Sequence, residues 1–222
     1  MKIIGHRGAA GLAPENTIAA LRKGLEHHAD MLELDLRVTG DGVVVLHHDP
    51  ELTDPNGDRH LIADCTYAEL KDHKKDLATF EEILAEFVGK VPLYVEAKPD
   101  VPSGPITKII EKSIINGLAP KDLVLASFSQ PILLELHAKL PQIDKVVLEK
   151  WSGVRATRRA RQLNTKLLCM NQKWLWWGFI RQMSRHSYKL MAYTLNDPKK
   201  ARRWARHGLY GLVTDYPDRF EK

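Results

Sequence analysis

Short apolar segments recur at regular intervals in the second half of the chain, and successive segments start 21, 21, 24 and 21 residues apart. Their first residues are Val124, Lys145, Lys166, Leu190 and Gly211. The stretches between them carry apolar residues at helical spacing, as in residues 131–140 and 197–208. This alternation predicts consecutive βαβ units and a parallel sheet whose apolar strands are covered on both faces.

Three further strand-like segments lie in the first half, at residues 2–5, 31–38 and 91–98. A helical pattern that begins at Asn16 or Thr17 and ends at His28 connects the first two. Three and five strands make eight, the number that closes a (β/α)8 barrel. We therefore expect an α/β protein with a TIM-barrel fold, in which residues 1–222 form a single barrel domain.

One segment interrupts the alternation. Residues 42–49 form a ninth strand-like run, and only a tight turn separates them from the strand at 31–38. So few residues cannot make a parallel crossover, and the two runs are expected to form an antiparallel hairpin. Residues 49–78 then read as a mostly irregular insertion after the second strand, rich in Pro, Gly, Asn and Asp. The spacing of Thr66 and Glu69 marks one short helix within this inserted rim segment.

The composition is that of an ordinary globular protein, with 44% hydrophobic and 27% charged residues among 222. Cys65 and Cys169 are far apart, which argues against a disulfide framework and against a cysteine-ligated zinc site. The first residues lack the long apolar run of a signal peptide, and no stretch approaches the length of a membrane span. These features predict a cytoplasmic protein.

The net charge of +5 conceals an asymmetry between the two halves of the chain. Residues 1–111 carry 12 Lys and Arg against 20 Asp and Glu, whereas residues 112–222 carry 21 against 8. An acidic half can host a cation and a basic half can attract anions, although solvated helix faces produce the same imbalance. The basic runs at 155–161 and 199–203 are typical of solvated helix faces, so we expect no nucleic-acid partner.

Polar residues lie where the predicted strands end, which is the active-site face of a (β/α)8 barrel. On the second strand Glu33, Asp35 and Arg37 alternate with Leu34 and Leu36. Side chains of a strand alternate between its two faces. The leucines are therefore expected to face the outer helices, and the charged residues to face the barrel mouth.

Glu96 and Lys98 alternate with Ala97 on the third strand, at the same mouth. Glu96 would join Glu33 and Asp35, and three carboxylates in a partly desolvated site repel one another strongly. A divalent cation relieves that repulsion, and ligands that are all oxygen favour Mg²⁺ or Ca²⁺ over zinc. The residues alone also permit a network of carboxylates with Arg and Lys that holds no metal.

Two histidines are expected beside these carboxylates. In the hairpin, residues whose numbers sum to 81 or 82 face each other, which places His48 opposite Glu33 or Leu34. His6 reaches the mouth from the end of the first strand, while His47 should point the other way. A pair of histidines at such a site can act as general acid and general base. Arg7 and Lys98, with Lys150 as a further candidate, add the positive charge that suits a phosphate-bearing substrate.

Several short motifs, in this order along the chain, resemble those of the glycerophosphodiester phosphodiesterases. They are H6-R7-G8, P14-E15-N16-T17, E33-L-D35, H48-D49, E96-A-K98 and T214-D215-Y216-P217. The resemblance covers nearly the whole chain, and the segment after His48 also resembles an insertion of that family. The ordered set is far more specific than any one of the motifs.

The resemblance implies a (β/α)8 fold and hydrolysis of glycerophosphodiesters, small molecules, to glycerol 3-phosphate and an alcohol. It implies that Glu33, Asp35 and Glu96 hold Mg²⁺ or Ca²⁺. His6 and His48 would be the acid–base pair, Arg7 and Lys98 would bind the phosphate, and Asn16 would brace the His6 loop. Family members are thought to use the glycerol 2-hydroxyl as an internal nucleophile, which gives a cyclic phosphate that water then opens.

The sequence departs from the family at the rim of the site. Tyr193 stands where the family often has Trp, and residues 52–57 stand where it often has a Thr-rich run. These departures concern substrate preference rather than the chemistry.

Two other functions remain open, and the oligomeric state is not determined by the sequence. One is cleavage of lysophospholipids by a lysophospholipase D-type enzyme that makes weak contact with a membrane surface, raised by Trp174, Trp176, Trp177 and Phe179. The other is a catalytically inactive binding module, against which the full set of histidines and carboxylates argues. Trp174 and Trp177, with Met183 or Arg181, lie at roughly helical spacing and should pack on the barrel, which would leave Trp176 and Phe179 off that face. We therefore expect one or two exposed aromatic residues and a preference for water-soluble glycerophosphodiesters.

Overall fold

A computed structural model describes residues 1–220 and contains a closed barrel of eight parallel strands. The strands are β1 (Lys2–Gly5), β2 (Met31–Val38), β6 (Leu93–Ala97), β7 (Leu123–Ser127), β8 (Asp144–Glu149), β9 (Leu167–Asn171), β10 (Lys189–Tyr193) and β11 (Gly211–Thr214). The barrel closes because β1 pairs with β11 on one side and with β2 on the other. The (β/α)8 prediction is therefore confirmed, with every predicted strand present.

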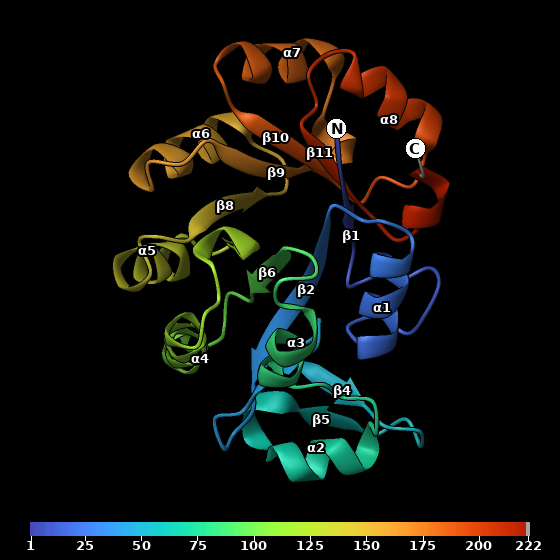
Figure 1. The fold of residues 1–222 in the computed structure, drawn as a ribbon, viewed down its shortest axis with the longest axis vertical. Helices are drawn as coiled ribbons and strands as arrows, with labels where there is room; N and C mark the ends of the chain where they lie inside the picture. Colours follow the sequence, from blue (N-terminus) through green and yellow to red (C-terminus); the bar gives the residue numbers. More distant parts are fainter. Residues whose placement is uncertain (221–222) are drawn as a thin grey trace.

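Helices surround the barrel (Figure 1). They are α1 (Ile18–Glu26), α3 (Phe80–Phe87), α4 (Ser103–Ile115), α5 (Gln130–Lys139), α6 (Gly153–Gln162), α7 (Trp177–Arg185) and α8 (Pro198–Ala205), with the short turns η2 (Pro120–Asp122), η3 (Gln172–Trp174) and η4 (Pro217–Phe220). Polar side chains begin several of them: Thr17 caps α1, and Thr79 forms a capping box with Glu82 at α3. The strand-to-helix connections thus leave the barrel at one common end.

The apolar core has one part outside the strands and one inside the barrel. Leu32, Leu34 and Leu36 of β2 pack outward against the helices, as their alternation predicts. Inside the barrel, Tyr94, Cys169 and further apolar residues form a second cluster, and both of these side chains also line the cavity described below. The charged residues that alternate with the leucines lie at the open end of the barrel interior.

Strand β2 runs on past the barrel and pairs there with β3 (Val44–Leu46). The pairing is antiparallel and joins Leu36 with Leu46 and Val38 with Val44, which confirms the predicted hairpin and fixes the sum of paired residue numbers at 82. The hairpin returns the chain to the barrel mouth, so that His48 follows β3 directly at that end of the molecule.

The inserted segment is more regular than its composition suggests. It contains the hairpin of β4 (Glu51–Thr53) and β5 (Arg59–Leu61), the turn η1 (Ile62–Asp64) and helix α2 (Tyr67–His73). The expectation of a mostly irregular segment is wrong because β4 and β5 pair across the turn that the Pro, Gly and Asn residues form. Helix α2 begins at the predicted capping box of Thr66 and Glu69. A small apolar cluster holds the segment together, formed by Val45, Leu52, Ile62, Leu70 and Leu77.

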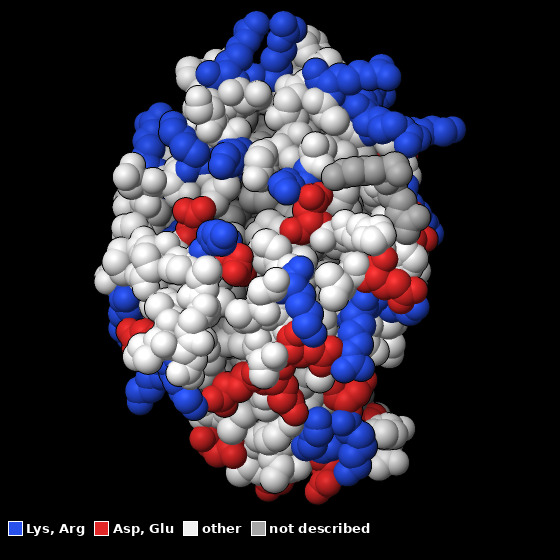
Figure 2. Space-filling view, viewed as in Figure 1, with Lys and Arg blue, Asp and Glu red and all other residues white. Residues whose placement is uncertain are grey.

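Charge is distributed unevenly over the surface. Lys and Arg side chains crowd the end of the molecule formed by α6, α7 and α8, whereas acidic side chains are most frequent in the lower half toward the insertion (Figure 2). The asymmetry of the sequence therefore persists in space. Among residues 1–220, no helix has both the length and the apolar character that crossing a membrane requires.

Candidate active site

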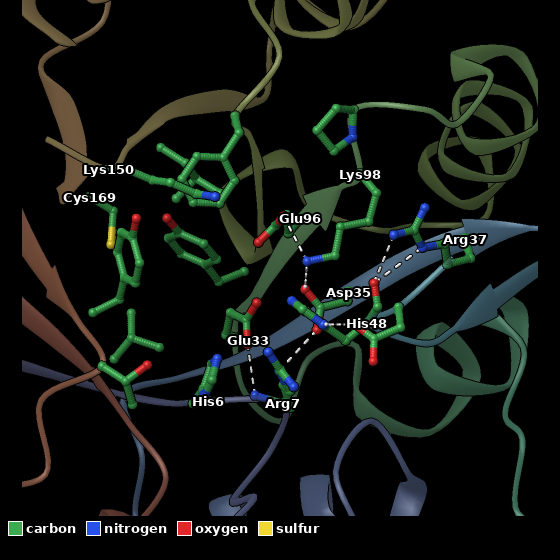
Figure 3. A pocket seen from close by; sticks show the side chains of 18 of the residues that line it. His6, Arg7, Glu33, Asp35, Arg37, His48, Glu96, Lys98, Lys150 and Cys169 are labelled. Carbon is green, nitrogen blue, oxygen red and sulfur yellow. Dashed lines mark hydrogen bonds and ion pairs between the residues drawn. The ribbon is translucent and has the colours of Figure 1, made fainter. Parts of the chain in front are cut away.

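A cavity of about 460 Å³ opens at the C-terminal ends of the barrel strands. Figure 3 shows its charged and imidazole side chains converging from several strands. They are His6, Arg7, Glu33, Asp35, Arg37, His48, Asp49, Glu96, Lys98 and Lys150. Its apolar wall is formed by Tyr94, Phe128, Leu148, Cys169, Tyr193 and Val213. The structure therefore brings all seven predicted site residues to one cavity.

The loop after β1 is held in a strained turn. Arg7 has a φ of 49° and Gly8 a φ of 89°, both in the left-handed region that L side chains rarely adopt. The backbone N–H of Arg7 donates to Oε2 of Glu33 at 2.7 Å, and that of Gly8 to the Glu33 carbonyl at 2.9 Å. A Cβ at Gly8 would lie 2.4 Å from the backbone of Ala20 in α1. Glycine thus lets the loop approach the helix closely and aim His6 and Arg7 inward.

Asp215 positions His6. Nδ1 of His6 lies 2.6 Å from Oδ1 of Asp215, whose Oδ2 accepts a hydrogen bond from Asn196 at 2.7 Å. Burial alone would lower the pKa of His6, but the hydrogen bond to Asp215 and the charge of Glu33 outweigh it and raise that pKa above its ordinary value. Sequence reasoning noted Asp215 only as part of a motif and missed this role. The signal in the sequence that could have indicated this role is the T-D-Y-P motif, which places Asp215 at the end of a barrel strand.

Three carboxylates meet beside His6. Glu33, Asp35 and Glu96 are all buried, and each offers an oxygen within 4.8 Å of the others. Burial, followed by the charge of Asp35, raises the pKa of Glu33 to about 8, and burial also raises the pKa of Glu96. Because three buried carboxylates this close together repel one another, they do not all ionise without a counter-charge. A hard divalent cation, which prefers oxygen ligands, fits such a group.

Cations of the protein compensate part of this negative charge. Nζ of Lys98 lies 2.6 Å from Asp35 and 2.8 Å from Glu96, and Nε of Arg7 lies 3.2 Å from Asp35. Nε of Arg7 is nonetheless buried without a well-aligned hydrogen-bond acceptor. The guanidinium of Arg7 therefore has one N–H without a hydrogen-bond partner among the described residues.

Asn16 contacts the loop of His6 through its backbone, whereas its side chain contacts Asp35. Its amide donates to Oδ2 of Asp35 at 2.8 Å and accepts from the backbone N–H of Asp35 at 3.0 Å. Only its backbone N–H reaches the loop, at the carbonyl of Arg7. Because Asn16 has a left-handed φ of 55°, its short side chain turns back to β2 and fixes that carboxylate.

His48 lines the same cavity as His6 and lies on the segment that follows β3 (Figure 3). Its Nδ1 lies 2.7 Å from Oδ1 of Asp49, and Arg37 donates to its carbonyl at 2.9 Å. Burial, then the charge of Lys98, lowers the pKa of His48. His47 does not line the cavity, as its position in the hairpin predicts. The two cavity histidines thus have pKa values displaced in opposite directions.

The aromatic residues of the β9–α7 connection are more exposed than expected. Trp174, Trp176 and Trp177 are each between 57% and 60% exposed, as is Trp151 in the β8–α6 connection. The predicted inward stripe is wrong for Trp174 and Trp177 because α7 begins only at Trp177. Its inward face is formed by Phe179, Ile180 and Met183, so the expectation that Phe179 lies off that face is also wrong.

Fold and cavity together define an α/β barrel with carboxylates, imidazoles and cationic side chains at its C-terminal face, where barrel enzymes carry their active sites. The family model described as "Glycerophosphoryl diester phosphodiesterase family" matches residues 6–219. The chain belongs to this family, which confirms the resemblance drawn from its motifs, and it is a phosphodiesterase enzyme.

Individual relatives agree with this assignment. A glycerophosphodiester phosphodiesterase of Bacillus subtilis is 28% identical over an alignment that covers 99% of this chain and 85% of the relative. A phosphodiesterase of Oleispira antarctica, solved in complex with the product sn-glycerol-3-phosphate, has a TM-score of 0.83 at 25% identity and covers 99% of this chain and 94% of its own. A human lysophospholipase D is 37% identical over 47% of this chain and 34% of its own length.

Proposed function

We propose that the protein hydrolyses glycerophosphodiesters to glycerol 3-phosphate and an alcohol, with a divalent cation, Mg²⁺ or Ca²⁺, and with His6 and His48 as the acid–base pair. The observation that carries this proposal is the placement of two histidines with oppositely displaced pKa values at one cavity with three buried carboxylates. Titratable groups whose environments separate their pKa values are what acid–base catalysis requires. The glycerol 3-phosphate product in the Oleispira relative supports the choice of substrate.

Glu33, Asp35 and Glu96 would hold the cation, which when bound supplies positive charge beside the phosphate. Arg7 and Lys98 would bind the phosphate oxygens. Lys98 is 6% exposed and held by two carboxylates, so it presents a fixed charge rather than a mobile one. Charge fixed in advance stabilises a reaction of a phosphodiester without reorganisation during the step.

In the first step His48, neutral because its pKa is lowered, takes the proton of the glycerol 2-hydroxyl as that oxygen attacks phosphorus. Nδ1 of His6 donates to Asp215, so its Nε2 is the nitrogen left to act on the substrate. His6 gives a proton to the alcohol oxygen as the P–O bond to the alcohol breaks. In the second step the roles reverse: His6 takes a proton from water as the water oxygen attacks the phosphorus of the cyclic phosphate. The bond between phosphorus and the glycerol 2-oxygen breaks, and His48 returns its proton to that departing oxygen, which becomes the 2-hydroxyl again.

Product analysis tests this proposal. The enzyme is incubated with glycerophosphocholine and glycerophosphoethanolamine, and with a matched diester in which the glycerol 2-hydroxyl is replaced by hydrogen. We expect glycerol 3-phosphate and the free alcohol from the first two, and no turnover of the third. Cleavage of the deoxy diester at a comparable rate contradicts the internal nucleophile, and absence of glycerol 3-phosphate from every substrate contradicts the proposed activity.

The exposed tryptophans favour a second candidate function, cleavage of lysophospholipids at a membrane surface. Trp151, Trp174 and Trp176 lie on connections that leave the C-terminal ends of β8 and β9, the face on which the cavity opens. Exposed aromatic rings with nearby Lys150 and Lys173 are residues that enter the interface of an anionic bilayer. The lysophospholipase D relative covers less than half of this chain, so this support is narrower.

One comparison of two substrates distinguishes the two candidate functions. The kcat/KM for glycerophosphocholine is measured beside that for lysophosphatidylcholine on vesicles that contain an anionic lipid. A tenfold or greater preference for the lipid, lost in Trp176→Ala and kept in Leu134→Ala, favours the second function. Leu134 is a suitable control because it is 42% exposed on α5. A preference for the soluble diester that neither substitution changes favours the first.

A further inference from the structure

A second group of ligating side chains lies in the insertion, outside the catalytic cavity. Asp54 follows β4, His60 lies in β5 and His73 ends α2. One atom of each lies within 4.8 Å of the other two, and none of the three residues lines the cavity. Figure 1 shows these elements at the end of the molecule remote from α7 and α8.

The distances within this group are long for hydrogen bonds. Oδ2 of Asp54 lies 3.4 Å from Nε2 of His60 and 3.5 Å from Nδ1 of His73, against a usual N–H···O distance of about 2.9 Å. Ligands of a tetrahedral zinc ion, with bonds of about 2.0–2.1 Å, lie about 3.3–3.4 Å apart. The two separations thus match the edges of a zinc coordination shell better than they match direct pairing.

The carboxylate of Asp54 is buried and held in a fixed orientation, as the carboxylate ligands of metal sites are. Its side chain is 4% exposed, and its Oδ1 accepts the backbone N–H groups of Asn56 and Asp58, both at 2.9 Å. These bonds orient the group and leave Oδ2 toward the two imidazoles.

We propose that Asp54, His60 and His73 form a binding site for Zn²⁺ or a similar transition-metal ion, with water as the fourth ligand. Two imidazoles select such an ion, whereas the oxygen-only group of the cavity selects Mg²⁺ or Ca²⁺. The two imidazole rings are stacked, with centroids 4.0 Å apart and planes 19° apart. Both side chains are partly exposed, at 25% and 36%, so they have room to turn apart around the ion.

The site would link the β4–β5 hairpin to α2. The insertion has only a small apolar cluster of its own, and small units commonly need a metal or a covalent link. Because the insertion begins directly after His48, fixing it also fixes the chain that carries that histidine. The ion acts as a structural link, and no step of the proposed hydrolysis passes through it.

Cobalt spectroscopy on the whole protein tests the site independently of activity. Co²⁺ is titrated into the metal-free Glu33→Gln variant, in which the cavity site is impaired, because a tetrahedral site absorbs visible light far more strongly than an octahedral one. We expect one equivalent to give the tetrahedral spectrum, competition by Zn²⁺, and at least a 10²-fold loss of Zn²⁺ affinity in His60→Gln and His73→Gln. His28→Asn, at an exposed histidine with left-handed φ, is the control and should bind as the parent does.

Hydrogen exchange supplies the second measurement. Zn²⁺ should slow amide exchange across residues 51–75 in the parent and in the control, and should leave it unchanged in His60→Gln and His73→Gln. Far-UV circular dichroism identifies any variant that fails to fold, and Asp54→Asn then replaces it. An octahedral Co²⁺ spectrum, or unchanged Zn²⁺ affinity in both folded histidine variants, overturns the proposal.

Discussion

Nδ1 of His6 lies 2.6 Å from Oδ1 of Asp215, although 209 residues separate the two in the chain. The contact exists because β1 and β11 are neighbours in the closed barrel, with Gly5 paired to Thr214. His6 follows one strand end and Asp215 the other. Closure of the barrel thus brings the two ends of the sequence into direct contact at the cavity.

Replacing Asp215 tests this contact. Asp215→Asn removes the carboxylate whose hydrogen bond and charge raise the pKa of His6, and we expect kcat to fall by about 10²-fold or more because His6 loses its orientation and tautomer. The sign of the pH effect follows: with a lower pKa, His6 loses its proton at lower pH, so the alkaline limb of the kcat profile moves down. An unchanged profile would show that Asp215 does not govern His6. Asn196→Ala should move the same limb less.

Single substitutions should distinguish the two cavity histidines, His6 and His48, from the adjacent His47 by their effect on kcat. His6→Ala and His48→Ala should each lower kcat by about 10²–10⁴-fold, the usual contribution of general acid–base catalysis, and remain folded. His47→Ala is the matched control, since His47 adjoins His48 yet does not line the cavity. Near-parental kcat in either cavity variant rejects the role of that histidine.

Metal binding should be coupled to proton release at Glu33. Its pKa of about 8 means that the metal-free site keeps a proton at neutral pH, which an incoming cation must displace. Mg²⁺ affinity should therefore rise between about pH 6 and 8, and calorimetry in buffers of different ionisation enthalpy should show a proton released. In Glu33→Gln this release should vanish, whereas equal proton release would assign it to another group.

The same pKa has a consequence for stability. A carboxyl group whose folded-state pKa is raised from 4.5 to about 8 stabilises the fold fully below pH 4.5 and loses that contribution as pH rises to 8. In the absence of metal, the Tm of the parent should accordingly decline between pH 4.5 and 8 more steeply than the Tm of the Glu33→Gln variant, because only the parent has the Glu33 carboxyl group to ionise. Mg²⁺ should restore the Tm of the parent at pH 8. Parallel Tm curves for parent and variant would contradict the assignment.

Much of the fold and the membership of the site follow from the sequence, because strand spacing, alternation on β2 and hairpin register are local patterns. The contact of Asp215 with His6 could not be predicted from local patterns, because it depends on which strands are neighbours in the closed barrel. The tryptophans were placed wrongly because helical spacing does not reveal that α7 starts at Trp177. Asp54, His60 and His73 escaped notice because a hairpin and a helix must pack before the three meet.

The most direct test of the account is glycerol 3-phosphate release from glycerophosphocholine before and after removal of divalent metal. Protein stripped with a chelator and assayed in its excess should lose at least about 10²-fold in kcat, because the buried carboxylates would then repel the phosphate. Addition of Mg²⁺ or Ca²⁺ beyond the chelator should restore the parental rate, and should not do so in the Glu33→Gln and Glu96→Gln double variant. Full glycerol 3-phosphate release by metal-free protein would contradict the account.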